Sequence, residues 1–414
     1  MTDFDVAVIG AGPAGLAAAL AAEKKGKRVL LIERAARMGG ILNQCIHDGF
    51  GLICFGEKLS GCEYANRYIN EVKTSGIEVS LLTFVTRIEK KEDIFHITLV
   101  SRSGVRSVTS AALVLSTGCR ERTAKQVSIH GTRPAGVFTA GSAQYYLNIL
   151  GEMPAKKCVI LGSGDIGLIM ARRLTLEGAE VIGVYEAKPA PSGLTRNIAQ
   201  CLDDFDIPLH VGHTVTRIYG EGRLTAVEIS RVDENMRPIA GTEQVVECDT
   251  LILSVGLIPE NELAETLDIK LDPRTKGPVC DQNYETSMDG VFVCGNALHV
   301  NDLVDYVSES GDAAGSAAAD YCGRKRELVD IGAGKDFAYA VPGRLDLCSD
   351  TAETVMFFRS RDVRDMTEVD VLVNGKSVFK RKFAKLKPPE MERIVVDFSG
   401  IKATDSILLE MKEA

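Results

Sequence analysis

Two glycine-rich segments carry residue types and a spacing suited to binding a pyrophosphate. The first, GAGPAG, spans residues 10–15, and the second, GSGDIG, spans residues 162–167. Each follows a short apolar run, and the next apolar run ends at an acid, Glu33 in the first case and Glu186 in the second. This order of strand, tight turn, helix and second strand is typical of a dinucleotide-binding unit. Two copies predict two dinucleotides in one chain, with an electron path between them.

The three glycines of the first segment have separate tasks. Gly10 permits the sharp turn, Gly12 lets backbone N–H groups approach the phosphates, and Gly15 lets the helix pack closely on the strand. The N-terminus of the helix adds partial positive charge beneath the phosphates. Glu33, 18 positions after Gly15, is placed to accept hydrogen bonds from a ribose.

The second segment is expected to bind a nicotinamide dinucleotide. A carboxylate at Glu186, 19 positions after Gly167, favours a ribose 2′-hydroxyl and repels a 2′-phosphate, which predicts NAD(H) rather than NADP(H). Lys188 and Arg196 lie nearby and count against that preference. The residues expected to contact this dinucleotide are Gly162, Gly164, Ile166, Gly167, Glu186 and Gly256.

The elements that must position these motifs form two Rossmann-like α/β domains, the second inserted into the first. Residues 1–122 and 273–332 make the discontinuous first domain, and residues 123–272 make the second. Within the first domain, the apolar pattern predicts helices near 61–74 and 302–321 and strands over 77–85, 95–100, 105–108 and 113–118.

Residues 336–414 are expected to form a small, antiparallel, β-sandwich-like domain. Glycine becomes rare there, and Asn374-Gly375 is a hairpin signal. A stabilising cap on the core and a docking module are both open roles for this domain. Its short β-rich runs cover residues 355–359, 368–373, 377–383, 393–398 and 407–411.

Composition narrows the class of protein. A chain of 414 residues is long enough for two or three domains, and its net charge of −9, without a long Lys/Arg block, argues against nucleic-acid binding. Its eleven cysteines are scattered and never spaced C-x-x-C, which predicts reduced thiols in a cytoplasmic protein and no zinc or internal iron–sulfur site. Neither a signal peptide nor a membrane span is expected.

The residues after Glu33 favour FAD as the first dinucleotide. The pair Gly39-Gly40, the strand ending Ser116-Thr117-Gly118 and the late turn Gly295-Asn296 make residues 3–330 similar to the pyridine nucleotide–disulfide oxidoreductases. That family of two-dinucleotide flavoproteins includes the thioredoxin reductases. The resemblance implies that FAD contacts Gly10, Gly12, Ala14, Gly15, Glu33, Arg34, Gly39, Gly40, Val85, Thr117, Gly118, Gly295, Asn296 and Val304.

One position departs from the family pattern. The usual late aspartate is Asn296 here, and the resemblance implies that this residue contacts the ribityl chain. An amide still hydrogen-bonds a hydroxyl but carries no charge. The helix that opens near residues 303–305 would direct its positive end at the flavin ring and stabilise the anionic reduced form.

The paired redox cysteines of the disulfide reductases are missing. Neither Cys-x4-Cys after Gly39-Gly40 nor C-x-x-C occurs, so disulfide reduction is disfavoured. Cys45 and His47 follow that glycine pair and are candidate catalytic residues near the flavin. Cys45 is either a single redox thiol or a packing residue, and His47 serves either proton transfer or loop hydrogen bonding.

A third candidate, His299, follows the Gly295-Asn296 turn and is also expected near the flavin. The competing interpretation of this segment is structural, with Asn301 or Asp302 capping the helix that comes next.

Residues 135–144, 161–173 and 255–263 resemble a narrower group. It comprises FAD/NAD-binding subunits of multi-subunit opine and amine dehydrogenases and an oxidoreductase associated with anaerobic glycerol-3-phosphate dehydrogenase. The loop of residues 39–56 and the segment 295–308 look most like the glycerol-linked type. The resemblance implies an oligomer that includes a second flavoprotein and a small iron–sulfur subunit.

The hypothesis that follows is an FAD-dependent NAD(H) oxidoreductase subunit. It would exchange electrons with a partner redox subunit, linked to oxidation of glycerol 3-phosphate or a similar substrate. A stand-alone NADH oxidase or NADH:acceptor reductase is the first alternative, and a non-catalytic FAD-binding scaffold is the second.

Overall fold

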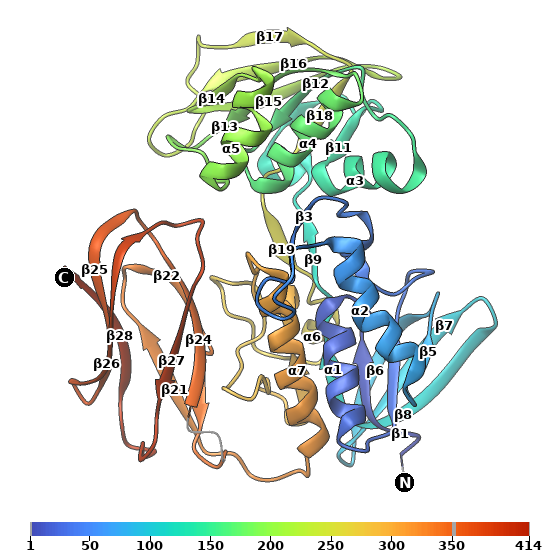
Figure 1. The fold of residues 1–414 in the computed structure, drawn as a ribbon, viewed down its shortest axis with the longest axis vertical. Helices are drawn as coiled ribbons and strands as arrows, with labels where there is room; N and C mark the ends of the chain where they lie inside the picture. The colour runs from blue at the N-terminus through green and yellow to red at the C-terminus, as the bar shows by residue number, and fades with distance from the viewer. Residues whose placement is uncertain (1, 350–352, 414) are drawn as a thin grey trace. The chain divides into compact units, whose positions relative to one another are not determined.

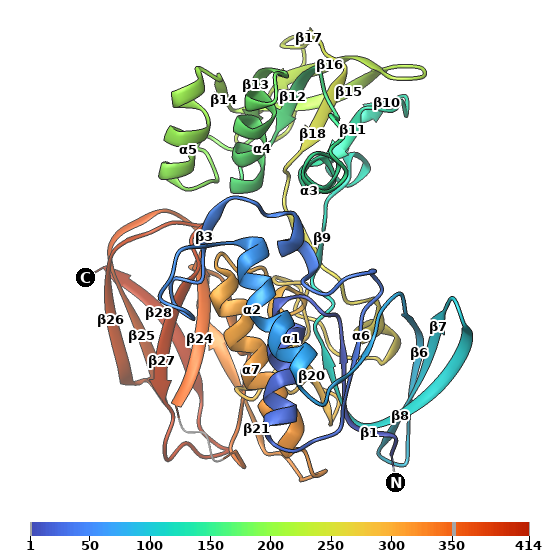
Figure 2. The same cartoon turned by 45° about the vertical axis from the view of Figure 1, so that its right-hand side comes forward.

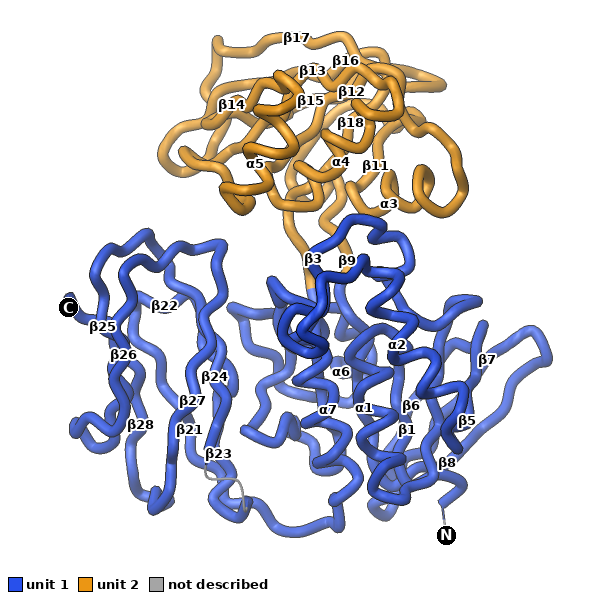
Figure 3. The backbone as a smooth tube through the Cα atoms, viewed as in Figure 1, with its two compact units in different colours: residues 1–119, 259–414 blue, residues 120–258 orange. Residues whose placement is uncertain are grey.

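The computed structural model describes residues 2–349 and 353–413. The chain divides into two compact units, Met1–Cys119 with Pro259–Ala414, and Arg120–Ile258 (Figure 3). Residues 259–272, which the sequence analysis places in the inserted domain, group with the first unit. We propose that the first unit binds FAD and that the second unit binds NAD(H). Within the described ranges, no helix has the length and apolar character needed to cross a membrane.

A parallel sheet of buried strands forms the centre of the first unit. Strands β1 (Phe4–Ile9) and β2 (Val29–Ile32) bury their apolar residues on both faces, as strands of parallel sheets do. The order is β5–β2–β1–β8, with β20 beside the end of β8 and the antiparallel β7 and β6 beside its start. The other bounds are β5 (Glu78–Ser80), β6 (Phe84–Lys91), β7 (Ile94–Ser101), β8 (Gly104–Leu115) and β20 (Val291–Val293).

The helices α2 (Gly61–Thr74) and α7 (Val304–Asp320) lie beside α1 (Pro13–Lys24) in the first unit (Figures 1 and 2). A Cβ on Gly311 would lie 2.2 Å from the carbonyl oxygen of Ala14, and one on Gly315 would lie 2.1 Å from that of Ala18. The small residues of α7 are therefore required for its close contact with α1. Shorter elements of this unit are α6 (Glu262–Thr266), β3 (Asp48–Phe50) and β4 (Leu59–Ser60).

The second unit repeats the strand, turn and helix order. Its parallel sheet has the order β11–β18–β12–β13–β14, and a smaller sheet has the order β10–β15–β16–β17. Strand β9 (Cys119–Glu121) leads into the unit and pairs with β19 (Leu257–Pro259), which leads out of it. The remaining bounds are β10 (His130–Gly131), β11 (Val137–Thr139), α3 (Ala140–Tyr145), β12 (Lys157–Leu161), α4 (Asp165–Leu176), β13 (Glu180–Glu186), α5 (Thr195–Cys201), β14 (Leu209–Val211), β15 (His213–Gly220), β16 (Leu224–Arg231), β17 (Gln244–Glu247) and β18 (Thr250–Leu253).

A C-terminal β domain is present, as expected. It is not wholly antiparallel, because its first strand, β21 (Leu328–Ala333), begins before residue 336 and pairs in parallel with β28. Two sheets, β23–β21–β28–β25–β26 and β22–β24–β27, enclose a hydrophobic core of their own. Asn374 and Gly375 have φ of 50° and 76°, and both values are positive, as a type I′ hairpin turn requires. The bounds are β21 (Leu328–Ala333), β22 (Phe337–Val341), β23 (Arg344–Asp346), β24 (Glu353–Ser360), β25 (Arg364–Val373), β26 (Lys376–Leu386), β27 (Glu392–Asp397) and β28 (Ile407–Glu413).

Candidate dinucleotide sites

The first glycine turn has no space for side chains at two of its three glycines. Gly10 has a φ of +106°, and a Cβ there would lie 2.4 Å from the carbonyl oxygen of Ser116. A Cβ on Gly15 would lie 1.8 Å from the carbonyl oxygen of Gly10. Gly12 differs, because a Cβ there meets no protein atom within 4 Å. The backbone is therefore open at Gly12, where α1 begins without a side-chain cap and its N–H groups favour an anion.

Glu33 directly follows β2, at the position that the pattern predicts, and its carboxylate retains acceptor capacity. Its buried carboxylate accepts hydrogen bonds from the backbone N–H groups of Ala11 and Ala35, each at 2.7 Å. A carboxylate has about four acceptor sites, so two of them are left for ribose hydroxyls. Arg34 forms an ion pair with Glu260 at 2.8 Å, and that hydrogen bond raises the pKa of the Arg34 guanidinium.

Several of the other residues assigned to FAD gather around Gly12. A Cβ on Gly40 would lie 3.0 Å from the Gly12 Cα, and one on Gly295 would lie 2.8 Å from the Ala14 Cβ. Gly39 donates its N–H to the carbonyl oxygen of Ala11 at 2.8 Å. The turn after β2 and the turn after β20 thus border the start of α1 from two directions.

Two of the residues assigned to FAD, Thr117 and Gly118, follow the end of strand β8. The Thr117 hydroxyl donates to the Glu260 carbonyl oxygen at 2.6 Å, and Gly118 has a φ of +76° with open space where a Cβ would lie. Val85 lies in β6, partly buried against the core of the unit. Thr83, two residues before it, donates its backbone N–H to the Glu33 carbonyl oxygen at 3.0 Å.

Asn296 uses its side chain within the protein. Its Oδ1 accepts from the backbone N–H of Asn301 at 3.0 Å, and its Nδ2 donates to the Cys119 Sγ at 3.5 Å. Val304 begins α7, whose preceding residue, Leu303, makes no side-chain cap. The open backbone at Gly12, the spare acceptors of Glu33 and the uncapped starts of α1 and α7 together fit an FAD.

Cys45 is a packed thiol. Its Sγ donates to the Ile41 carbonyl oxygen at 3.4 Å, and burial raises the pKa of the thiol to about 12. The side chain fills the space beside Gly61, where an added Cβ would lie 2.6 Å from that of Cys45. A thiol with this pKa stays protonated at neutral pH and is a poor nucleophile. His47 lies close by in the chain, with its ring centroid 5.1 Å from that of Phe50.

We expect NADH to reduce the flavin of Cys45→Ser at a rate within about twofold of the native rate. A protonated, packed thiol takes no part in electron transfer. Anaerobic stopped-flow absorbance measures this rate. A loss of tenfold or more in a variant that folds and retains FAD would assign Cys45 a redox role.

His299 lies in a buried aromatic cluster. Its ring centroid is 5.7 Å from that of Tyr339 and 5.4 Å from that of Phe357, both in the C-terminal β domain. Burial, with a smaller contribution from Arg359, lowers the pKa of His299 to about 3, so its imidazole is neutral at physiological pH. We propose that His299 attaches the turn after β20 to the β domain rather than transferring protons.

The expectation that Asn301 or Asp302 caps α7 is wrong. The residue before the helix is Leu303, and no side chain makes a cap hydrogen bond. Asn301 Nδ2 instead donates to the His299 carbonyl oxygen at 2.9 Å. Asp302 pairs with Arg359 of β24 and accepts the Met391 N–H at 2.6 Å, because the β domain offers it stronger partners.

The second glycine turn has the same construction as the first. Gly162 has a φ of +95°, and a Cβ there would lie 2.1 Å from the Ser254 carbonyl oxygen. A Cβ on Gly167 would lie 2.7 Å from the Ser254 Cβ, whereas one on Gly164 would make only ordinary contacts. Ile166 packs partly buried on the core beneath α4, and Gly256, with a φ of +101°, follows β18.

Glu186 differs from Glu33 in that four donors of the chain approach its carboxylate, three of them at Oε2. Its buried carboxylate accepts from the Ser163 hydroxyl and backbone N–H at 2.5 Å and 3.1 Å, from the Lys188 N–H at 3.0 Å and from the Ser192 hydroxyl at 3.3 Å. Three of these donors share Oε2 and only the Lys188 N–H reaches Oε1. A ribose hydroxyl can therefore bind at Oε1 or replace Ser192, which makes the longest contact. Sequence reasoning missed both serines, although Ser163 lies inside the motif.

The segment that follows β13 lies over the start of α4. Asp165, in the first turn of α4, accepts from the Leu194 N–H at 2.9 Å and from Asn197 Nδ2 at 2.7 Å. An added Cβ on Gly193 would lie 2.8 Å from the Ser163 carbonyl oxygen. Residues 192–197 therefore border the position that the motif assigns to the second dinucleotide.

Two glycine turns on parallel sheets, each with a buried acid at the end of the next strand, are typical of a protein with two dinucleotide-binding units. A family model described as pyridine nucleotide-disulphide oxidoreductase matches residues 4–318, and the chain belongs to this family. It is a flavin-dependent oxidoreductase that uses FAD and NAD(P)(H).

Relatives share this organisation at low identity. An opine oxidase subunit of Agrobacterium tumefaciens (strain Ach5) is 27% identical over 367 residues, which cover 80% of this chain and 66% of that protein. The chain thus spans just under two thirds of that relative. Thioredoxin reductase of Treponema pallidum (strain Nichols) is 27% identical over 325 residues, 77% of this chain and 97% of that protein. The crystal structure of T. acidophilum thioredoxin reductase shares the fold with a TM-score of 0.62, at 22% identity, over 77% of this chain and 98% of that one.

Proposed function

We propose that this chain is the FAD-dependent NAD(H) oxidoreductase subunit of a larger enzyme that oxidises glycerol 3-phosphate or a similar substrate. The observation that carries the proposal is the repeated arrangement of a glycine turn and a buried acid, at Gly12 and Glu33 and again at Gly164 and Glu186. FAD, when bound, supplies the conversion between two-electron hydride chemistry and one-electron steps. The protein's part is to bind both dinucleotides and to hold their phosphates and riboses.

A partner redox subunit belongs to the proposal because the chain has no cysteine pair of the kind that disulfide reductases use. The thiol nearest the Gly39-Gly40 turn, Cys45, is held protonated by burial, with a pKa of about 12. The similarity to a protein named as one subunit of opine oxidase supports a multi-subunit enzyme. The link to glycerol 3-phosphate is supported by the resemblance of the loop 39–56 and the segment 295–308.

Glu186 supports NAD(H) as the preferred nicotinamide dinucleotide. We expect Glu186→Ser to raise the NADPH-to-NADH ratio of kcat/KM for flavin reduction by about tenfold, since it removes a charge that repels a 2′-phosphate. Glu180→Ser, at the other end of β13, is the matched control, because Glu180 is exposed and pairs with Lys157. Native protein that is reduced equally fast by NADPH and NADH would contradict the assignment.

Anaerobic titration of the FAD-loaded chain with NADH tests the whole proposal. We expect the visible flavin absorbance to be lost at about one equivalent of NADH, and turnover of the isolated chain with oxygen to be slow. A chain that takes up no FAD contradicts the FAD assignment, and one that binds FAD without bleaching favours the scaffold alternative. Rapid NADH oxidation by the isolated chain favours a stand-alone oxidase. Bleaching of the native complex by glycerol 3-phosphate identifies the substrate.

A further inference from the structure

A buried carboxylate joins the first turn of α7 to a loop more than 250 residues earlier in the chain. Asp305 Oδ1 accepts hydrogen bonds from the backbone N–H groups of Ile53 at 3.2 Å and Cys54 at 2.8 Å, and Oδ2 accepts one from Gly51 at 3.3 Å. Only 3% of Asp305 is exposed. A buried carboxylate is tolerated where N–H donors satisfy its oxygens, and these three donors all belong to one loop.

Apolar burial does not hold the middle of this loop. Leu52 and Ile53 are 59% and 57% exposed, whereas Phe50 and Phe55 on either side are partly buried against the core. The side chains of residues 52 and 53 therefore contribute little to the position of the loop. Between the two phenylalanines the loop is attached by the hydrogen bonds to the Asp305 carboxylate and by longer contacts of the Cys54 thiol. That thiol accepts from the Tyr64 hydroxyl and donates to the Asp305 carbonyl oxygen, each at 3.6 Å.

The helix that carries Asp305 is itself fixed in place. The Tyr64 hydroxyl of α2 donates to the Ser308 hydroxyl, one turn further along α7, at 2.8 Å, and both residues are buried. The close contact between α7 and α1 holds the helix from another side. Asp305 is thus a rigid point to which a weakly packed loop is bound.

The loop of residues 51–54 and the start of α7 both follow turns that border the proposed FAD site. The loop follows the Gly39-Gly40 turn, which contacts Gly12, and α7 follows the Gly295-Asn296 turn, which contacts Ala14. The start of α7 has no side-chain cap, so its N–H groups carry partial positive charge. Asp305 places a negative charge inside that first turn, where it opposes the field of the helix.

We propose that Asp305 is a positioning residue with two effects: it holds residues 51–54 against α7, and its charge offsets the positive end of that helix, which makes the flavin harder to reduce. The first effect concerns the protein alone. The second rests on the proposed function, because it requires the flavin ring near the start of α7.

Amide hydrogen exchange of the full chain without added cofactor tests the first effect. In the native protein we expect the amides of Gly51, Ile53 and Cys54 to be protected, and Asp305→Asn to speed their exchange by about tenfold, since an amide oxygen replaces a charged acceptor. Asp312→Asn, an exposed position on the same helix, should leave them unchanged. Fast exchange of these three amides in the native chain would contradict the proposal that Asp305 holds residues 51–54, even if the variant fails to fold.

The flavin potential, measured against a reference dye, tests the second effect. We expect Asp305→Asn to raise the ratio of reduced to oxidised flavin at a fixed dye ratio by about tenfold, because a nearby negative charge is lost. Asp312→Asn should leave the ratio within about twofold of native, because that charge is exposed to solvent and screened. An unchanged ratio in folded, flavin-loaded Asp305→Asn overturns the electrostatic role. If the chain binds no FAD, the proposed function is wrong, but the exchange result still shows whether Asp305 holds residues 51–54 against α7.

Discussion

Replacing Gly12 with alanine is expected to weaken FAD binding by about 100-fold, or about 2.8 kcal/mol, without unfolding the protein. The alanine Cβ would meet no protein atom within 4 Å, and Gly12 has an extended backbone, with φ of −74° and ψ of −176°, that any residue adopts. The methyl group therefore enters only the space assigned to the pyrophosphate. The free energy of unfolding of the flavin-free variant should stay within about 1 kcal/mol of native.

Gly15→Ala is the matched comparison, because it adds the same methyl group one helical turn away. Its Cβ would lie 1.8 Å from the Gly10 carbonyl oxygen, so the turn itself must move. We expect a loss of about 3 kcal/mol or more in the free energy of unfolding, since the clash is with backbone. Denaturant titration of flavin-free protein, with FAD affinity from fluorescence quenching, separates the two variants. Native FAD affinity in Gly12→Ala would refute the proposed position of the pyrophosphate.

The glycine turns and the acids that follow them could be predicted because their causes are local. Gly10 and Gly162 both have positive φ next to a carbonyl oxygen of a neighbouring strand, and no other residue type fits there. The hairpin at Asn374-Gly375 was predictable for the same reason. In each case a few consecutive residues determine the geometry.

Features set by long-range contacts could not be predicted. The strand expected over 77–85 is interrupted, because Leu82 adopts a φ of 49° and donates its N–H to the Ala35 carbonyl oxygen, which lies on the loop after β2. The strands β21 to β23 lie in a region without a strong alternating pattern, and they form through pairing with each other and with β24 and β28.

The surroundings of the candidate catalytic residues were equally inaccessible from the sequence. Nothing near His299 in the chain indicates that Tyr339 and Phe357 enclose it, since both come from the C-terminal domain. The four donors to Glu186 include Ser192, whose position depends on how the segment after β13 folds back. Residue types indicated that chemistry was available at these sites, but burial and partners decide which residues can take part in it.

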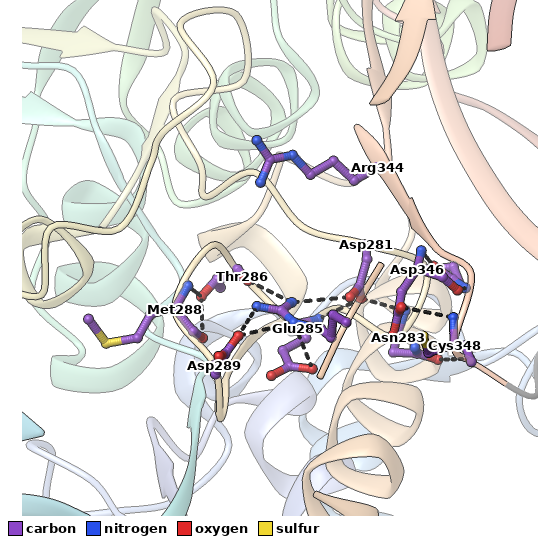
Figure 4. A network of polar contacts seen from close by, with 12 residues as sticks. Asp281, Asn283, Glu285, Thr286, Met288, Asp289, Arg344, Asp346 and Cys348 are labelled. Carbon is purple, nitrogen blue, oxygen red and sulfur yellow. Dashed lines mark hydrogen bonds and ion pairs between the residues drawn. The ribbon is translucent and has the colours of Figure 1, made fainter. Parts of the chain in front are cut away.

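Within the first unit, a buried ion cluster holds the segment that leads into the C-terminal β domain. Arg326, in the segment between α7 and β21, lies 3.3 Å from Asp281 and 3.7 Å from Glu285, and its side chain is only 5% exposed. It also donates to the Thr286 carbonyl oxygen at 2.9 Å. Figure 4 draws this network with Asp281 and Glu285 labelled. Burial raises the pKa values of both carboxyl groups, and the Arg326 charge opposes that rise.

We expect Arg326→Met to cost about 3–5 kcal/mol of unfolding free energy, because it leaves Asp281 and Glu285 buried without their cation. Arg344→Met is the control, with an expected cost of about 0–1 kcal/mol. Arg344 is drawn apart from the cluster in Figure 4, and it pairs with Asp330, whose side chain is 82% exposed. Urea denaturation at neutral pH measures both variants.

The pH dependence of the stability lost in Arg326→Met distinguishes an uncompensated buried charge from a loss of packing. A carboxyl group whose pKa is higher in the folded than in the unfolded protein binds its proton more tightly when folded, so lowering the pH favours folding. Without Arg326, the pKa values of Asp281 and Glu285 should rise further, and the defect should shrink as the pH falls from 8 toward 5. Asp281→Asn with Glu285→Gln in the same chain should restore much of the lost stability at neutral pH. A defect that is the same at every pH, and that these amides do not repair, would mean that Arg326 acts through packing alone.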